Sequence, residues 1–176
     1  CLLLEALKRL TYRGYDSVGM AVCDGVNLRI LKDVGKVDEV QQKCNFAHLV
    51  GTTGIGHVRW ATHGGVTAQN AHPFVDCTGR IALAHNGIID NYLELRGELE
   101  ARGHRFTSQT DSEVLVHLIE HYLKDDLVVA VRQALARIKG TYAIALISTT
   151  APNTIIGARQ GSPLIFARGL KGSWLA

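Results

Sequence analysis

Apolar residues recur along this chain with two periods, one typical of helices and one typical of strands. Helical spacing predicts five helices, at 2–10, 37–44, 91–103, 110–124 and 127–140. The fourth begins at "TDSE", where Thr110 and Glu113 fit a capping box. Gly103 and Gly140 stand at the ends of the third and fifth, where glycine commonly closes a helix.

Strand-like segments fill most of the remaining chain. "SVGMAVCDG" and "NLRILKD" predict a strand pair that turns at Asp24-Gly25. Further strands are expected in "IGHVRWAT", "RIALAHNG", "YAIALIS", "NTIIGAR" and "PLIFAR". Because strands come in adjacent pairs and helices in adjacent groups, antiparallel sheets with segregated helices are favoured over a doubly wound parallel sheet. We therefore predict an α+β fold, with two sheets face to face and helices outside them, a four-layer sandwich.

Composition narrows the class of protein. A chain of 176 residues is sufficient for one domain, and no apolar run approaches the length of a membrane span. The net charge is +3, and the basic residues after Asp126 are dispersed without interleaved aromatics. We expect a cytoplasmic protein with reduced cysteines and with neither a nucleic-acid nor a membrane partner.

Two polar stretches contain more charged and aromatic residues than a connecting loop would need. "YRGYDS", residues 12–17, is consistent either with a loop that ends a helix or with a functional segment. "HVRWATHGG", residues 57–65, places polar groups where a strand gives way to Gly-Gly, and alternation puts His57 and Arg59 on one face. Arg59 could form a strand-end salt bridge, but its guanidinium also suits a ligand carboxylate, and we favour the ligand role.

A third stretch, "AHNGIID" at 84–90, allows two interpretations. Asn-Gly between apolar runs is a signal for a tight hairpin. An asparagine amide beside a glycine N–H could also form an oxyanion hole for a tetrahedral intermediate. From these residues alone the turn is slightly favoured.

"HLIEH" at 117–121 matches the pattern of an inverted zinc-peptidase helix. Such a site needs a further ligand, usually a downstream carboxylate, and the chain has no Asp or Glu after Asp126. Glu113, His117, Glu120, His121 and Lys124 also form one polar stripe, most simply a solvated helix face. We therefore predict no metal at His117 and His121.

Taken together, these stretches resemble the glutaminase domains of the glucosamine 6-phosphate synthase family, which are class II glutamine amidotransferases. The resemblance is carried by "LLEALKRLTYRGYDSVGMAV", "GIGHVRWATHGGVTAQNAHP", "ALAHNGIIDNYLELRGEL" and "TSQTDSEVLVHLI", and "GTYAIALIS" and "GARQGSPL" extend it. "YRGYDS" and "RWATHG" are its specific signatures. Other N-terminal-nucleophile amidotransferases, of the amidophosphoribosyltransferase or asparagine synthetase type, would be expected to differ there.

The resemblance implies an N-terminal-nucleophile hydrolase fold and hydrolysis of glutamine to glutamate and ammonia, without a cofactor. An N-terminal cysteine would be the nucleophile and its free α-amine the general base. The site residues that it implies, each by its matching motif, are Cys1, Arg13, Arg59, Trp60, Thr62, His63, His72, Asn86, Gly87 and Asp111.

Within that set, Arg59 would hold the glutamine α-carboxylate and Asp111 the α-ammonium. Asn86 and Gly87 would form the oxyanion hole, which settles that stretch in favour of function. Trp60, Thr62 and His63 would line the site, with Trp60 near the ammonia exit. Arg13 and His72 would have supporting roles.

The chain departs from the family pattern at both ends. Cys1 directly precedes "LLLEALKRL", so the glycine and first strand expected after the nucleophile are absent. The chain also stops before the sugar-isomerase domains that the resemblance implies as partners of this domain in the full-length enzyme. A homodimer is expected for that full-length enzyme. We interpret residues 1–176 as a glutaminase domain without its first strand. A glutamine-binding fragment that has lost its nucleophile is the alternative.

Overall fold

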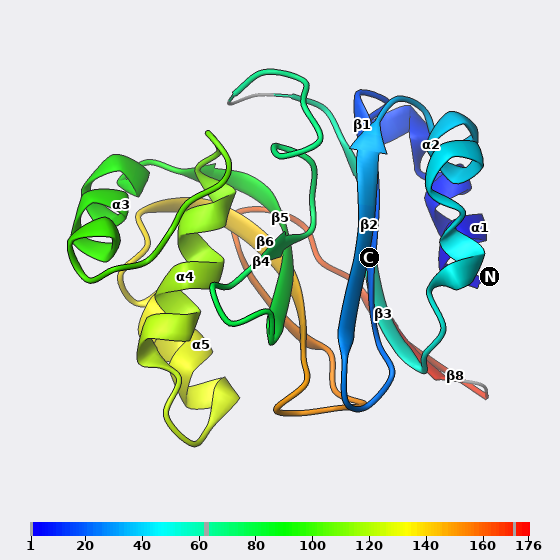
Figure 1. Cartoon of the computed structure of the whole chain (residues 1–176). Helices are drawn as coiled ribbons and strands as arrows, with labels where there is room; N and C mark the ends of the chain where they lie inside the picture. Colours follow the sequence, from blue (N-terminus) through cyan, green and yellow to red (C-terminus); the bar gives the residue numbers. More distant parts are fainter. Residues whose placement is uncertain (1, 62–63, 171) are drawn as a thin grey trace.

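The computed structural model describes residues 2–61, 64–170 and 172–176. Its helices and strands follow the order of Figure 1. The α-helices are α1 (Leu2–Arg9), α2 (Val37–Cys44), α3 (Tyr92–Ala101), α4 (Ser112–Tyr122) and α5 (Leu127–Leu135). The strands are β1 (Ser17–Cys23), β2 (Leu28–Val34), β3 (Thr53–Arg59), β4 (Phe74–Val75), β5 (Ile81–Ile89), β6 (Gly140–Ser148), β7 (Ile156–Gln160), β8 (Phe166–Gly169) and β9 (Gly172–Leu175).

Two antiparallel sheets form the centre of the molecule. One has the strand order β2-β1-β3 and the other has the order β4-β5-β6-β7, while β8 and β9 form a separate hairpin. Helices α1 and α2 cover the outer face of the first sheet, and α3, α4 and α5 lie on the opposite side, over the second (Figure 1). The predicted four-layer α+β sandwich is therefore confirmed.

The side-chain pattern of β1 explains why its sheet is covered on both faces. All seven residues of β1 are buried. Val18, Met20 and Val22 pack in the cluster beneath α1 and α2, while Ala21 and Cys23 point the other way, into a cluster with Ala82 and Ala84 of β5 and with Ile55 and Ile147. Small side chains in this central layer let the two sheets approach closely.

The largest apolar cluster lies between the second sheet and its helices. Leu115, Leu118 and Ile119 of α4 pack there with residues of β5, β6, α3 and α5, such as Leu83 and Leu146. At about 25 cal/mol per Å² of apolar surface removed from water, this cluster is the main source of stability for that half of the fold. It also holds α4, whose first residue follows Asp111, in a fixed position.

Two predicted helix boundaries are wrong. Glu113 does not form a capping box with Thr110, because its carboxylate accepts hydrogen bonds from the N–H groups of Thr107 (2.9 Å) and Ser108 (2.7 Å). Gly140 does not end a helix but begins β6, where its φ is +120° and an added Cβ would lie 2.2 Å from the carbonyl oxygen of Ile88. In both cases a contact with a residue outside the predicted helix determines the local structure.

The predicted solvated stripe on α4 is also wrong for Glu113, His117 and Glu120, whereas Lys124 is exposed. Glu113 and His117 are 2% and 1% exposed. Residues 104–107 and the β4–β5 turn contact this face, through bonds to Glu113 and Glu120. Within the described ranges, no helix has the length and apolar character needed to cross a membrane.

Candidate active site

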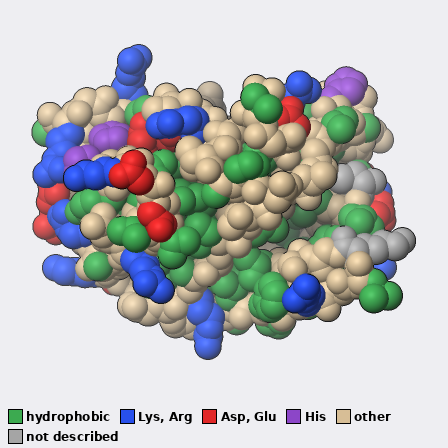
Figure 2. All heavy atoms as spheres, turned by 90° about the horizontal axis from the view of Figure 1, so that it is seen from below, with side chains coloured by type: hydrophobic (Ala, Val, Ile, Leu, Met, Phe, Trp, Pro, Cys, Tyr) green, Lys and Arg blue, Asp and Glu red, His purple; other side chains and the backbone are tan. Residues whose placement is uncertain are grey.

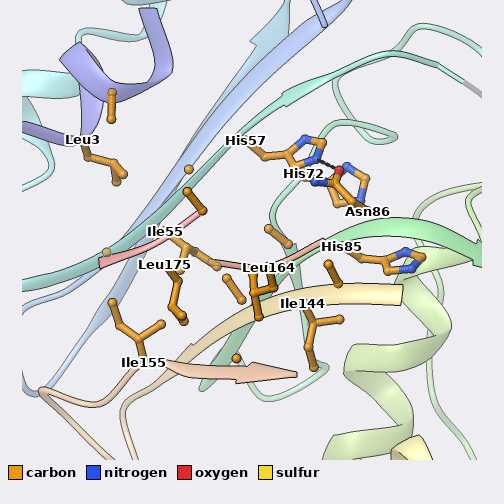
Figure 3. A pocket seen from close by; sticks show the side chains of 18 of the residues that line it. Leu3, Ile55, His57, His72, His85, Asn86, Ile144, Ile155, Leu164 and Leu175 are labelled. Carbon is orange, nitrogen blue, oxygen red and sulfur yellow. Dashed lines mark hydrogen bonds between the residues drawn. The ribbon is translucent and has the colours of Figure 1, made fainter. Parts of the chain in front are cut away.

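A cavity of about 1760 Å³ opens between the two sheets. His57 of β3, Asn86 of β5 and His72 meet in one part of it, while Ile55, Leu164 and Leu175 line another part (Figure 3). Arg59 and Asp111 also line this cavity. The structure therefore brings most of the site residues predicted from the sequence to one place.

Arg59 and Asp111 supply opposite charges to the cavity, and each is 4% exposed. Arg59 is the last residue of β3, and its Nη1 donates to the carbonyl oxygen of Gly65 at 3.2 Å. Asp111 Oδ2 accepts a hydrogen bond from the N–H of Ile89 at 2.8 Å. Burial lowers the pKa of Arg59, and the carboxylates of Asp16 and Asp111 oppose that shift. Arg59 nonetheless stays charged at neutral pH.

Asn86 and Gly87 lie inside β5, paired with Ala143 and Tyr142 of β6, so the hairpin interpretation of "AHNG" is wrong. The side chain of Asn86 is exposed to the cavity, and its Oδ1 lies 2.8 Å from Nε2 of His57. Burial lowers the pKa of His57 to about 4, so at neutral pH the ring is neutral and its Nε2–H donates to Asn86. With Oδ1 engaged in this way, the Nδ2 hydrogens of Asn86 are the donors left for a ligand.

Gly87 is required by its backbone. Its φ is +137°, and an added Cβ would lie 2.1 Å from the carbonyl oxygen of Thr141. Only glycine adopts this conformation without strain and allows β6 to approach so closely. The residue therefore combines a structural requirement with its expected role as an N–H donor.

We expect Gly87→Ala to destabilise the fold by about 2–4 kcal/mol, because the new methyl group adds a backbone clash to an unfavourable φ. Gly97→Ala is the matched control, since a Cβ on this α3 residue meets nothing within 4 Å. It should stabilise by about 0.5–1 kcal/mol. Urea denaturation monitored by circular dichroism measures both, and equal stability of the two variants would contradict the close approach.

His72 lies beside His57, with ring centroids 4.3 Å apart, and the residue is 5% exposed. Burial lowers the pKa of His72 well below its ordinary value, and the neighbouring His57 adds to the shift. Neither ring nitrogen has a hydrogen-bond partner among the described residues. His72 is therefore neutral, and it packs against the imidazole that orients Asn86.

The segment "YRGYDS", residues 12–17, packs against the backbone of residues 59–61 at the end of β3. Asp16 accepts a hydrogen bond from the N–H of Ala61 through Oδ2 (2.8 Å), and its own N–H donates to the carbonyl oxygen of Arg59 (3.0 Å). Gly14 packs so closely on this backbone that a Cβ would lie 2.6 Å from the carbonyl carbon of Arg59. Arg13 is exposed and lines the cavity.

Trp60 lies at the rim of the cavity, 59% exposed, with its ring 5.7 Å from that of Tyr15. Cys1, Thr62 and His63, which were also predicted as site residues, lie outside the described residues.

Sequence reasoning missed three residues that organise the site. The sequence predicted only that His57 shares a strand face with Arg59. Its hydrogen bond to Asn86 connects β3 with β5, and no pattern in the local sequence indicates that contact. Asp16 was noted only as part of its motif. Asn70 binds Gly65 O through Nδ2 (2.9 Å) and accepts from Gln109 N–H through Oδ1 (2.9 Å). It thus ties the segment after β3 to the segment before Asp111, and nothing in its local sequence marks it.

Comparison with known proteins agrees with this geometry. Residues 57–175 match the model of the glutamine amidotransferase domain family. The fold is shared with glutamine phosphoribosylpyrophosphate amidotransferase from B. subtilis, at a TM-score of 0.82 and 30% identity, covering 98% of this chain and 37% of that one. A second solved structure, an allosteric regulatory enzyme of purine biosynthesis, has a TM-score of 0.82 and 33% sequence identity. The match covers 94% of this chain and 36% of that one. The chain belongs to the glutamine amidotransferase domain family.

More similar sequences narrow the family further. A glutamine–fructose-6-phosphate aminotransferase (isomerizing) from Methanothermobacter thermautotrophicus is 56% identical over 169 residues, which is 95% of this chain and 28% of that protein. One from Thermus thermophilus is 49% identical over 174 residues, 99% of this chain and 29% of that protein. The chain thus spans somewhat over a quarter of the length of these relatives. The family predicted from "YRGYDS" and "RWATHG", and its N-terminal-nucleophile fold, are confirmed.

Proposed function

We propose that this chain hydrolyses glutamine to glutamate and ammonia, and that the ammonia supplies glucosamine 6-phosphate synthesis from fructose 6-phosphate in the full-length protein. The observation that carries the proposal is the pair of buried opposite charges, Arg59 and Asp111, in the cavity that also contains Asn86 and Gly87. A free amino acid is a zwitterion, so it needs one fixed cation and one fixed anion. A zwitterion can complement both charges at once, which a neutral or singly charged ligand cannot do.

The substrate would lie with its α-carboxylate on Arg59 and its α-ammonium on Asp111. Arg59 can donate two parallel hydrogen bonds to a carboxylate. Asp111 accepts hydrogen bonds from the N–H of Ile89 at Oδ2 and from Oγ of Ser112 at Oδ1 (3.4 Å), and the remaining lone pairs of its carboxylate can accept from an ammonium. With the α-carboxylate and the α-ammonium both held, the side-chain amide of glutamine would extend towards Asn86 and Gly87. Binding in this orientation would lower the entropic part of the activation barrier.

The reaction would begin when the thiol of Cys1 attacks the amide carbon while the α-amine accepts the thiol proton. The amide oxygen becomes an oxyanion, which Nδ2–H of Asn86 and N–H of Gly87 stabilise. Collapse of the intermediate breaks the C–N bond, and the proton taken up by the amine goes to the departing ammonia. Water then hydrolyses the thioester to glutamate and restores the thiol.

The remaining residues would have supporting tasks. His57 is a positioning residue, since it acts through Asn86, and His72 packs behind it. Trp60 and Tyr15 would border the exit of ammonia, Thr62 and His63 would line the site, and Arg13 would support it at the cavity edge. Sugar-isomerase domains would receive the ammonia in the full-length protein, which we place in the cytoplasm as a homodimer.

The binding half of the proposal predicts that Arg59→Ala and Asp111→Ala each weaken glutamate binding by about 1.5–3 kcal/mol, because each removes charge-assisted hydrogen bonds. Isothermal titration calorimetry measures the loss, and Arg29→Ala, an exposed cation on β2, is the control that should bind normally. Glutarate, which lacks the α-ammonium, should bind the wild type weakly and be insensitive to Asp111→Ala. Unchanged glutamate affinity in both variants, with the fold intact, would refute the assignment.

A further inference from the structure

A second group of polar side chains gathers on the outer side of α4, away from the cavity between the sheets. It consists of Cys77 in the β4–β5 turn, His104 in the segment after α3, and His117 and Glu120 of α4. His117 follows Asp111 by six residues, about 9 Å along the helix axis. Unlike Arg59, Asn86 and Asp111, none of the four lines the cavity between the sheets.

The four ligand atoms converge on one point. Oε2 of Glu120 lies 3.0 Å from Nδ1 of His104 and 3.1 Å from Nδ1 of His117. Sγ of Cys77 lies 3.6 Å from Nδ1 of His117 and 3.9 Å from Nδ1 of His104. All four atoms lie within 4.8 Å of one another.

These separations are close to the edges of a tetrahedral zinc site. With Zn–N and Zn–O bonds of about 2.0–2.1 Å and a Zn–S bond of about 2.3 Å, neighbouring nitrogen and oxygen ligands lie about 3.3 Å apart and sulfur lies about 3.6 Å from nitrogen. Around an ion, the two Glu120–histidine separations would lengthen by about 0.2–0.3 Å and the Cys77–His104 separation would shorten by about 0.3 Å. The donor set of one sulfur, two nitrogens and one oxygen suits zinc, and a thiolate with a carboxylate would neutralise its two charges.

The surroundings of His117 also favour a cation. Its Nε2 lies 3.7 Å from Oε1 of Glu113, whose carboxylate is held by N–H groups of Thr107 and Ser108. At 3.7 Å this contact is an ion pair and not a hydrogen bond, and Nε2 has no hydrogen-bond partner among the described residues, so the carboxylate attracts the ring proton to that side by charge alone. The lone pair of Nδ1 then faces Oε2 of Glu120, and two acceptors 3.1 Å apart need a proton or a metal ion between them.

Backbone groups hold the other ligands in place. The N–H of Arg105 donates to Sγ of Cys77 at 3.3 Å and so fixes the orientation of this side chain, while burial raises the pKa of its thiol. The N–H of Cys77 donates to Glu120 Oε2 at 3.1 Å. The side chains of His104 and Glu120 are only 11% and 13% exposed. His104, His117 and Glu120 are thus largely buried while Cys77 is exposed, and the group joins three segments that are distant in sequence.

We propose that Cys77, His104, His117 and Glu120 form a structural zinc site that fastens the β4–β5 turn and residues 104–107 to α4. Zinc enters as the thiol proton of Cys77 leaves, and each histidine binds through Nδ1. Because four protein ligands close the coordination sphere, the site has no open position for catalysis.

This site differs from the zinc-peptidase pattern considered in the sequence. "HLIEH" pairs His117 with His121, but His121 contacts Arg102 through Nε2 and is not one of the four ligands. The downstream carboxylate that the sequence lacks is replaced by Glu120 and by two residues upstream of the helix. The proposal therefore reverses the prediction of no metal for His117 and keeps it for His121.

Cobalt binding to the intact, tag-free protein tests the proposal. After removal of metal with a chelator, one equivalent of Co²⁺ per chain should produce strong visible bands of tetrahedral cobalt and a near-ultraviolet thiolate-to-cobalt band. One equivalent of Zn²⁺ should abolish both. Zinc should also raise the melting temperature in proportion to the logarithm of its concentration.

Cys77→Ser should remove the thiolate band and weaken cobalt binding at least tenfold, and Glu120→Gln should weaken it similarly. His121→Ala, Cys44→Ser and Cys1→Ala should keep both bands, because these residues lie outside the four ligands. Cys77→Ser alters an exposed turn residue, so circular dichroism should show an intact fold. No stoichiometric cobalt, a wild-type spectrum without the thiolate band, or loss of the band in Cys1→Ala would overturn the proposal and leave a protonated hydrogen-bond network around Glu120.

Discussion

If Cys1 is the nucleophile, the glutamine analogue 6-diazo-5-oxo-norleucine should attach to it, one molecule per chain, and acetylation of its α-amine should abolish glutaminase activity. A cysteine thiol ordinarily has a pKa of about 8.5 and an α-amine about 7.7–8.0, so near neutral pH a fraction of the amine is free to accept the thiol proton. Acetylation removes that base and leaves the thiol in place. Tryptic mass spectrometry locates the label, and an ammonia-release assay measures the activity.

The other cysteines serve as internal controls for the labelling. Cys23 is buried between the sheets, and Cys44 and Cys77 lie on the outer layers. Labelling at one of these instead, or no labelling while glutamate still binds, would falsify the nucleophile role of Cys1. The chain would then be a glutamine-binding segment without its catalyst, and the assignments of Arg59 and Asp111 would stand.

Asn86→Ala should lower kcat for glutamine hydrolysis by about 10²–10³, with little change in KM. Removal of one oxyanion-hole donor typically costs about this much, because the bond matters most when charge develops on the substrate oxygen. Glutamate affinity should be nearly unchanged, since Arg59 and Asp111 remain. Steady-state kinetics with calorimetry separates the two effects, and Asn27→Ala, at the exposed β1–β2 turn, is the control.

His57→Ala should act in the same direction as Asn86→Ala but by a smaller factor, because it frees the amide of Asn86 without removing it. In the double variant the two effects should fall well short of additivity, as expected for residues that act as a unit. A loss in Asn86→Ala that appears entirely in KM would instead assign Asn86 to ground-state binding.

Much of the local structure could be predicted from the sequence, because it depends on short-range spacing. The strand pair around Asp24-Gly25 and the helix after Cys1 follow from alternation and helical period alone. The position of α2 follows in the same way, and β1 and β2 pair in register from Ser17–Val34 to Cys23–Leu28. Elements of two residues such as β4 carry no such signal, which is why it was missed.

The candidate site was predictable only in part. Arg59, Asn86, Gly87 and Asp111 were found through motifs whose order matches a known family. His57 and Asn70 were not, because each acts through a partner that is distant in sequence: 29 residues for His57 and Asn86, and 39 for Asn70 and Gln109. No local pattern records such a bond.

The sequence by itself determined the layer order of the fold, its family and the charged residues of the candidate site, since these depend on periodicity and on motifs. The tertiary structure decided whether Asn86-Gly87 turns or runs on as a strand, because the β6 backbone across from Gly87 settles that choice. It also decided that the polar face of α4 is buried. Glu113, His117 and Glu120 look like a solvated stripe until residues 104–107 and the β4–β5 turn cover them, and only that packing brings Cys77 and His104 to the same point.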